Sequence, residues 1–252
     1  MFSITLKPFA RSKSATWLAT TSISLVPIED DGILRDGTNS NTPQILQWTT
    51  GYDAIGTTTP ITMSSRWLYT YANNLSNTYS QWAPVGNSSA FNVGLGFTMK
   101  GSGSTNSYQN YLFTGKPNNG TIINYVNPGN SALVGNPYPS AIDAEEFIRD
   151  NIPGGDGDPS RSTGSIDGSL YFWEHYTQNS THIVADYEGG YAVLNYVGGI
   201  AASSPPPSAE GYEILGGPGT KVPERYIPVG QGFFVTSAPI KDSEGNVDSD
   251  GI

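Results

Sequence analysis

The chain is 252 residues long, carries a formal net charge of −10 and contains no cysteine. Charged residues make up only 13% of it, whereas glycine (30), proline (18) and tyrosine (15) are frequent. An acidic chain repels phosphate backbones, so we expect no nucleic-acid partner. The lack of cysteine excludes disulfides and thiolate metal sites. No apolar run approaches the roughly 18 residues that a membrane-spanning helix needs, so we expect no membrane insertion.

Residues 1–65 combine weak strand patterns with stretches rich in threonine, asparagine and glycine. We assign them as an N-terminal segment that supplies strands and loops of a first half. Residues 66–130 are predicted to form a first β unit and residues 131–252 a second one. The chain stops at Ile252, directly after a predicted turn, so we expect the second unit to be truncated and the chain to be a fragment of a longer protein.

Short strands dominate the first β unit. Trp67–Tyr71 and Ser107–Thr114 alternate between two kinds of side chain, as strands with one buried face do. Asn119-Gly120 favours the positive φ angles of a type I′ turn. This dipeptide therefore predicts a hairpin in which Thr121–Val126 is the returning strand.

One short helix is predicted near residues 143–151. Asp143 is a good N-cap, and Glu146 stands at the third helical position, where it would complete a capping box. Ile142 and Phe147 have the spacing of a hydrophobic staple. The Pro-Gly dipeptide that follows cannot continue the helix and so ends it.

A motif appears twice in the chain. Val93–Met99 (VGLGFTM) is echoed by Val229–Val235 (VGQGFFV), and an aromatic segment precedes each copy, Leu68–Tyr71 or Leu170–Trp173. Internal similarity of this kind indicates related structural units. Many short strands with one helix indicate antiparallel sheets packed on each other. We therefore predict an all-β fold, an antiparallel β-sandwich or sandwiches with two related halves and pseudo-symmetry.

Four segments carry a resemblance to a known group of proteins: Leu133–Asp143, Leu170–His175, Gly189–Ala192 and Ile227–Val235. Their order and chemistry resemble a β-rich region of large secreted or cell-surface proteins of Bacteroidetes. In those proteins the region lies upstream of the C-terminal sorting domain that the type IX secretion system uses. The resemblance implies export and residence outside the cell or on its surface. It implies no catalytic activity and carries over no functional residues.

The aromatic residues offer a candidate binding site. Rings on a sheet face can stack on sugars, and alternation places Tyr171, Trp173 and His175 on one face of their strand. The alternative is that such rings pack across strands, as they do in any sheet. The candidate ligand-binding residues are Trp67, Trp82, Tyr171, Trp173, Tyr187 and Tyr191.

Three carboxylates offer an alternative, catalytic interpretation. Glu174, Asp186 and Glu188 lie close in sequence, with His175 and His182 nearby. A glycoside hydrolase needs two carboxylates about 5–10 Å apart, and these residues could supply them. The competing interpretation is that they are solvated charges or turn caps. No dinucleotide-binding fingerprint and no Gly-x-Ser-x-Gly elbow points to another class of enzyme.

Acidic side chains near the C-terminus suggest a calcium site. Asp242, Glu244, Asn246, Asp248 and Asp250 place an oxygen ligand at every second position, which suits a loop around a hard cation. The spacing is not that of an EF-hand, and a solvated acidic turn is the alternative.

The expected function is a non-catalytic structural or adhesive β module of a larger exported protein, located extracellularly or at the cell surface. A polysaccharide or cell-surface glycan and the neighbouring domains of the longer chain are its expected partners. A polysaccharide-active glycoside hydrolase on a β-sandwich is the alternative.

Overall fold

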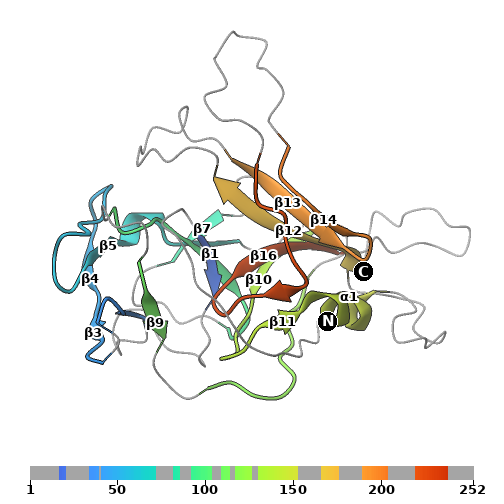
Figure 1. The fold of residues 1–252 in the computed structure, drawn as a ribbon, viewed down its shortest axis with the longest axis horizontal. Helices are drawn as coiled ribbons and strands as arrows, with labels where there is room; N and C mark the ends of the chain where they lie inside the picture. The colour runs from blue at the N-terminus through green and yellow to red at the C-terminus, as the bar shows by residue number, and fades with distance from the viewer. Residues whose placement is uncertain are drawn as a thin grey trace, which may run out of the picture.

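The computed structural model describes residues 17–20, 34–39, 41–71, 82–85, 92–103, 109–113, 117–126, 130–152, 166–175, 189–203 and 219–237. For Trp17–Thr20, Phe113 and His175 it describes the backbone only. These residues form many short strands and a single α-helix (Figure 1).

Two antiparallel sheets form the centre of the fold. The first contains, in spatial order, β1 (Trp17–Thr20), β8 (Gly96–Met99), β6 (Tyr69–Tyr71) and β7 (Trp82–Pro84). The second contains β10 (Ser131–Gly135), β16 (Gly232–Ser237), β12 (Ile166–His175), β13 (Gly189–Asn195) and β14 (Gly198–Ile200). Every neighbouring pair in both sheets is antiparallel. The prediction of an all-β fold built from antiparallel sheets is confirmed.

The two sheets share one plan, and the repeated motif has the same place in both. The motif strand, β8 or β16, lies between an edge strand, β1 or β10, and an antiparallel pair of consecutive strands, β6–β7 or β12–β13. Just before each motif strand the chain turns through a glycine with positive φ, Gly94 at 86° and Gly230 at 73°. An L-residue with a side chain rarely adopts such angles, so both copies need glycine at this point.

The strand registers also agree between the sheets. Gly96 pairs with the last residue of β1, and Gly232 pairs with the last residue of β10. Two residues further along, each motif strand pairs with a tyrosine. Thr98 pairs with Tyr69 in the first sheet, and its equivalent, Phe234, pairs with Tyr171 in the second. The predicted two related halves with pseudo-symmetry are therefore confirmed.

Each sheet buries one face in a core of its own, and equivalent positions fill both cores. The pairs of equivalent buried residues are Leu68 and Leu170, Val85 and Leu194, Phe97 and Phe233, and Met99 and Val235. Because side chains alternate along a strand, the residues between these point to the opposite face. That opposite face is where the two sheets meet.

Different structures cover the two cores. Over the first lie β2 (Leu34–Asp36), β3 (Gln44–Ile45) and β9 (Tyr111–Phe113), which pair with one another, and β4 (Gln47–Thr49) with β5 (Thr62–Ser64). A 3-10 helix, η1 (Ser65–Trp67), leads from this cover into β6. Over the second core lie α1 (Ala144–Asn151) and the pair β11 (Ile142–Asp143) and β15 (Tyr226–Ile227). In Figure 1 the first cover lies at the left and α1 at the lower right.

The helix is found where it was predicted. Asp143 is the N-cap, and its side chain accepts from the backbone N–H groups of Glu145 and Glu146. Ile142 and Phe147 are both fully buried in the second core, as expected for a hydrophobic staple. The expected capping box is not formed, because both carboxylate oxygens of Glu146 accept from Arg149, at 2.7 and 2.8 Å.

The predicted hairpin at Asn119-Gly120 was wrong. Thr121–Val126 forms no strand, and β9 pairs with β2 instead of with it. Gly120 does have the positive φ (77°) that Asn-Gly favours, but no strand follows it. The side chain of Asn124 instead donates to the carbonyl of Val93. The β4–β5 pair is parallel, an exception to the otherwise antiparallel sheets.

Candidate functional site

Aromatic rings fill the space between the two sheets, and Phe234 is at their centre. Tyr71 and Trp82 face each other across β6 and β7 with ring centroids 5.2 Å apart, and Trp173 and Tyr191 do so across β12 and β13 at 5.1 Å. Phe234 lies 5.1 Å from Tyr71, 5.8 Å from Trp82 and 5.7 Å from Tyr191, each time nearly edge to face. Aromatic rings prefer this geometry. The two ring pairs occupy equivalent positions, so the pseudo-symmetry extends to the contact between the halves.

The structure therefore brings together most of the candidate ligand-binding rings, but between the sheets. Trp82, Tyr171 and Trp173 pack against Phe234 and Leu133. Tyr171 and Trp173 do share one face of β12, as predicted. A Cβ at Gly189 would collide with the Trp173 ring, so the glycine next to β12 is part of the same packing. Cross-strand packing accounts for this group without a ligand.

Sequence reasoning missed two members of this ring cluster. Tyr71 stands opposite Trp82, and the pairing follows from the register of β6 and β7. Phe234 is the second phenylalanine of the second motif copy, where the first copy has Thr98. A comparison of the two copies at this position would have drawn attention to it.

The one described candidate catalytic residue, Glu174, is tied to a neighbouring segment. Only 6% of it is exposed. One carboxylate oxygen accepts from the backbone N–H of Thr220 at 3.1 Å and from its hydroxyl at 3.4 Å, and the other accepts from the N–H of Lys221 at 3.2 Å. A Cβ at Gly219 would collide with this carboxylate. Glu174 thus fixes residues 219–221 against the end of β12.

The remaining candidates fall outside the described residues. They are the carboxylates Asp186 and Glu188, the ring of Tyr187, and the calcium candidates Asp242, Glu244, Asn246, Asp248 and Asp250. The hydrolase and calcium hypotheses therefore stay predictions. Within the described ranges no group of at least three His, Cys, Asp or Glu side chains is placed to hold a metal ion.

Trp67 lies apart from the other rings, in a cluster on the surface of the first half. Its indole N–H donates to the carbonyl of Tyr52 at 2.6 Å, and the two ring centroids are 6.3 Å apart at 50°. The guanidinium of Arg66 lies 4.0 Å from the centre of the Tyr52 ring and donates to the Tyr52 hydroxyl at 3.0 Å. Lys100 lies 5.5 Å from the Trp67 ring and pairs with Asp53 at 2.7 Å. We call Tyr52, Asp53, Arg66, Trp67 and Lys100 the Trp67 cluster.

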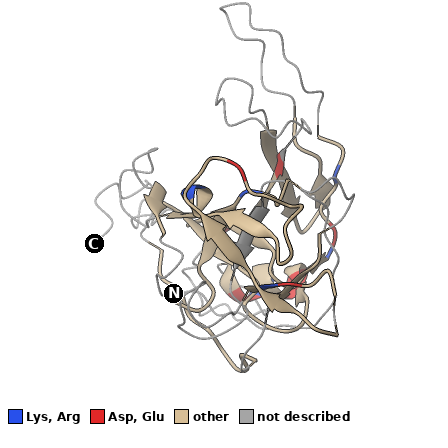
Figure 2. Cartoon of the chain, turned by 90° about the vertical axis from the view of Figure 1, so that its left-hand side faces the viewer, with Lys and Arg blue, Asp and Glu red and all other residues tan. Residues whose placement is uncertain are grey.

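Three members of this cluster are exposed, while Trp67 itself is half-buried. Tyr52 is 45% exposed, the side chain of Asp53 is 59% exposed, and Arg66 is exposed. Figure 2 looks at the molecule from the side of β3–β5 and shows long stretches of ribbon without charged residues. Two cations beside two rings are therefore a notable concentration for this chain. Of the candidate rings that the structure describes, Trp67 lies beside exposed charged side chains, whereas Tyr191, although 40% exposed, packs against Trp173 and Phe234.

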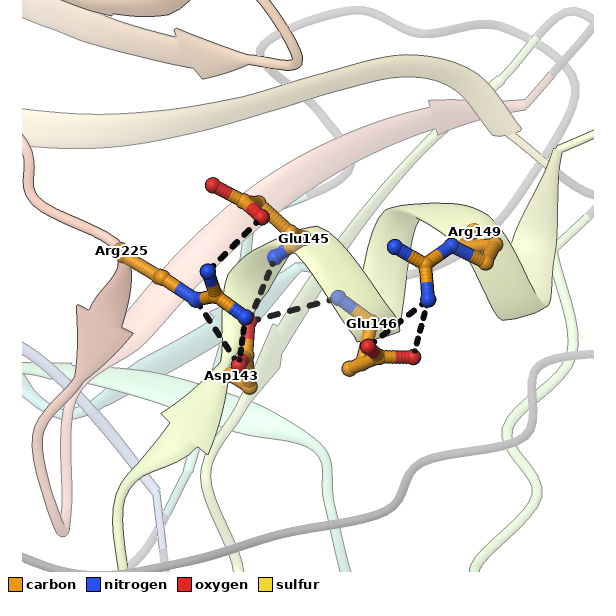
Figure 3. A network of polar contacts seen from close by, with 5 residues as sticks. All are labelled: Asp143, Glu145, Glu146, Arg149 and Arg225. Atoms are coloured by element: carbon orange, nitrogen blue, oxygen red, sulfur yellow. Dashed lines mark hydrogen bonds and ion pairs between the residues drawn. The ribbon is translucent and has the colours of Figure 1, made fainter.

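A network of charges at the start of α1 has a structural role (Figure 3). Arg225 donates to one oxygen of Asp143 through Nε at 2.9 Å and through a terminal nitrogen at 2.7 Å, and it lies 3.1 Å from Glu145. Burial by itself would raise the pKa of Asp143. Hydrogen bonds from Arg225 and from the first helical N–H groups outweigh burial and lower that pKa. The network joins β15 to the helix.

The segment around Asn136, part of the resemblance to exported proteins, is also structural. Asn136 is fully buried, and its amide donates to the carbonyls of Ser140 (2.5 Å), Ile227 (3.2 Å) and Pro228 (3.2 Å). Its side-chain oxygen accepts from the N–H of Tyr138. This asparagine therefore fixes the turn after β10 to the end of β15.

Comparison with protein families assigns the chain to one of them. Residues 48–249, which include both copies of the repeated motif, match a domain of unknown function (DUF8693). The chain belongs to this family. No curated protein and no solved structure matches the chain. No described helix of this DUF8693 member is long and apolar enough to cross a membrane.

Proposed function

We propose that the chain is a non-catalytic structural or adhesive β module of a larger exported protein, and that it works outside the cell or on its surface. The observation that carries this proposal is that Glu174 and the rings between the sheets make contacts within the fold. The carboxylate accepts hydrogen bonds from residues 220 and 221, and the rings join two related sheets. Because the candidate carboxylate and most of the candidate rings stabilise the fold, they support a structural role for the module.

The sequence supports the location. The resemblance to secreted Bacteroidetes proteins that carry a sorting domain implies export, and the chain is acidic and free of cysteine. Sparse charge and frequent threonine, serine, asparagine and tyrosine suit a surface that contacts glycans through rings and hydrogen bonds.

A paired assay tests this function. The chain is mixed with insoluble plant and algal polysaccharides, and one half of each sample is assayed for released reducing ends while the other is centrifuged to measure bound protein. We expect binding to at least one material without an increase in reducing ends. Release of reducing ends at enzyme-like rates, abolished by Glu174→Gln, would overturn the non-catalytic proposal.

A second measurement tests the location. Intact cells of the source organism are treated with a protease that does not enter them, and the chain is then detected with an antibody. We expect the signal to be lost from intact cells, whereas protection until lysis would contradict surface residence.

A further inference from the structure

Arg66 has no acidic partner among the residues that the structure describes, unlike three other cations of the chain. Arg149 pairs with Glu146, Arg225 with Asp143 and Glu145, and Lys100 with Asp53. Within the described residues Arg66 contacts the ring and the hydroxyl of one side chain, Tyr52. An exposed guanidinium without a carboxylate is unusual in a chain with a net charge of −10.

The position of Arg66 prepares it to bind an anion. Its guanidinium lies over the Tyr52 ring, which limits the orientations of the side chain. A planar guanidinium presents five N–H donors in a rigid fork that matches two oxygens of one anionic group. Because one terminal nitrogen donates to Tyr52, the other donors can bind a carboxylate or sulfate without breaking a salt bridge.

The two rings beside Arg66 point to a sugar as the carrier of that anion. Tyr52 is 45% exposed, and Trp67 lies at 50° to it with its indole N–H already bonded to a backbone carbonyl. Two tilted rings with satisfied polar groups present apolar surface, which suits the C–H faces of sugar rings. Lys100 adds a second cation beside the Trp67 ring, and its charge is balanced by Asp53, so Arg66 carries the charge of the cluster that is not paired among the described residues. An acidic peptide would use the charges but has no need of two adjacent rings.

We propose that the Trp67 cluster binds an acidic polysaccharide, with Arg66 bonding to a carboxylate or sulfate and with Tyr52 and Trp67 contacting the sugar rings. This inference rests on the proposed adhesive function and names its ligand class. Asp53 holds Lys100 at 2.7 Å and so fixes the second cation beside Trp67. The attraction is electrostatic and on the surface, so it weakens as the salt concentration rises.

Affinity electrophoresis of the whole chain tests the proposal. Gels contain polygalacturonate, dextran sulfate, neutral dextran or polyglutamate, and the first two distinguish carboxylate from sulfate as the source of the anion. We expect retardation by an anionic polysaccharide and a loss of affinity of about 10-fold or more with Arg66→Ala, since a hydrogen bond to a charged group contributes about 1.5–3 kcal/mol. Arg66→Lys should lose most of this affinity because lysine lacks the fork. Tyr52→Ala should also weaken binding.

Matched controls separate the cluster from charge and ring content in general. Arg149→Ala removes another arginine with an exposed side chain, and Tyr125→Ala removes a tyrosine that is 67% exposed. We expect both to bind like the original chain, and thermal melts verify that every variant is folded.

The outcomes distinguish this inference from the proposed function. Binding to an anionic polysaccharide that Arg66→Ala leaves unchanged, or equal retardation by neutral dextran, overturns the inference while adhesion to glycans stands. Equal retardation by polyglutamate overturns the choice of a sugar. Absence of binding to all the polysaccharides overturns both this inference and the glycan-binding form of the proposed function.

Discussion

The first and second sheets share strand order and register over four equivalent strands but differ at the centre of their contact. The second motif copy places Phe234 between the sheets, where its ring meets three others. The first copy places Thr98 there, and its hydroxyl donates to the carbonyl of Trp67 at 2.7 Å. Two bulky rings at the two equivalent positions would compete for one space. The difference teaches that a repeated framework can be symmetric while the interface between its copies is not.

The covers of the two sheets differ more than the sheets do. Short strands and η1 cover the first core, whereas a helix covers the second. The equivalent positions Phe97 and Phe233 are nonetheless almost fully buried, at 1% and 0% exposure. The same buried pattern on a strand thus accepts either kind of cover.

The largest expected effect comes from removing these equivalent core rings. Phe97→Ala and Phe233→Ala should each lower the free energy of unfolding by about 3–5 kcal/mol, the usual cost of truncating a buried phenylalanine. Phe233→Ala should cost more, because that ring also contacts two other rings. Phe147 meets it edge to face and Phe172 at a tilt, each with ring centroids 5.5 Å apart. Urea denaturation of both variants measures the difference. A negligible loss for Phe97→Ala would break the equivalence of the two cores.

The position at which the two motif copies differ, Thr98 or Phe234, gives the next largest effect. Phe234→Thr makes the second copy match the first, and it should cost about 3 kcal/mol because the ring contacts between the sheets are lost. Thr98→Ala removes a hydroxyl hydrogen bond and should cost only about 1 kcal/mol. Urea denaturation of both variants measures the two losses of unfolding free energy and so their ratio. Equal losses at the two positions would mean that Phe234 does not join the sheets.

Glu174 tests a contact that the structure describes in the second half. Glu174→Ala leaves the N–H groups of Thr220 and Lys221 without their acceptor and should cost about 1–3 kcal/mol. Glu174→Gln keeps one oxygen acceptor and should cost less. Thermal melts give both values. Unchanged melting temperatures would show that the carboxylate is free for another role.

The smallest effect is the acid dependence of two partly buried carboxylates, Asp143 and Asp36. The pKa of Asp143 is lowered, and so is that of Asp36, where hydrogen bonds from Thr38, Ile61 and Gln109 outweigh the burial that would raise it. A lowered folded-state pKa means that the stabilisation is complete above the ordinary value of 3.8 and is lost as the pH falls below it. Asp143→Asn should remove part of this acid loss and cost about 1 kcal/mol or less at neutral pH. Unfolding free energies across the acid range measure it, and an unaltered pH profile would contradict the assignment.

Local and repeated signals in the sequence were enough to predict the framework. Asp143 as N-cap and the Gly-x-Gly-Phe copies gave the helix and the equivalent strands. The return strand at Thr121–Val126 was wrong because partners distant in sequence decide pairing, and β9 pairs with β2 instead of with its neighbour.

The site was harder to predict than the fold. Composition marks Trp82 and Trp173 as aromatic but does not say whether a ring faces solvent or a second sheet. The Trp67 cluster depends on Tyr52 and Lys100, which are 48 positions apart in the chain and are brought together by η1 and the end of β8. No motif of adjacent residues announces such a cluster.

The central claim is that aromatic side chains of the two halves hold the related sheets together, and a double-mutant cycle between Tyr71 and Phe234 tests it most directly. The two rings belong to different sheets and lie 5.1 Å apart at 85°. Unfolding free energies of Tyr71→Leu, Phe234→Leu and the double variant give the coupling between the side chains. We predict a favourable coupling of about 0.5–1.5 kcal/mol, the range for edge-to-face aromatic pairs. Additive losses, with no coupling, would contradict the claim.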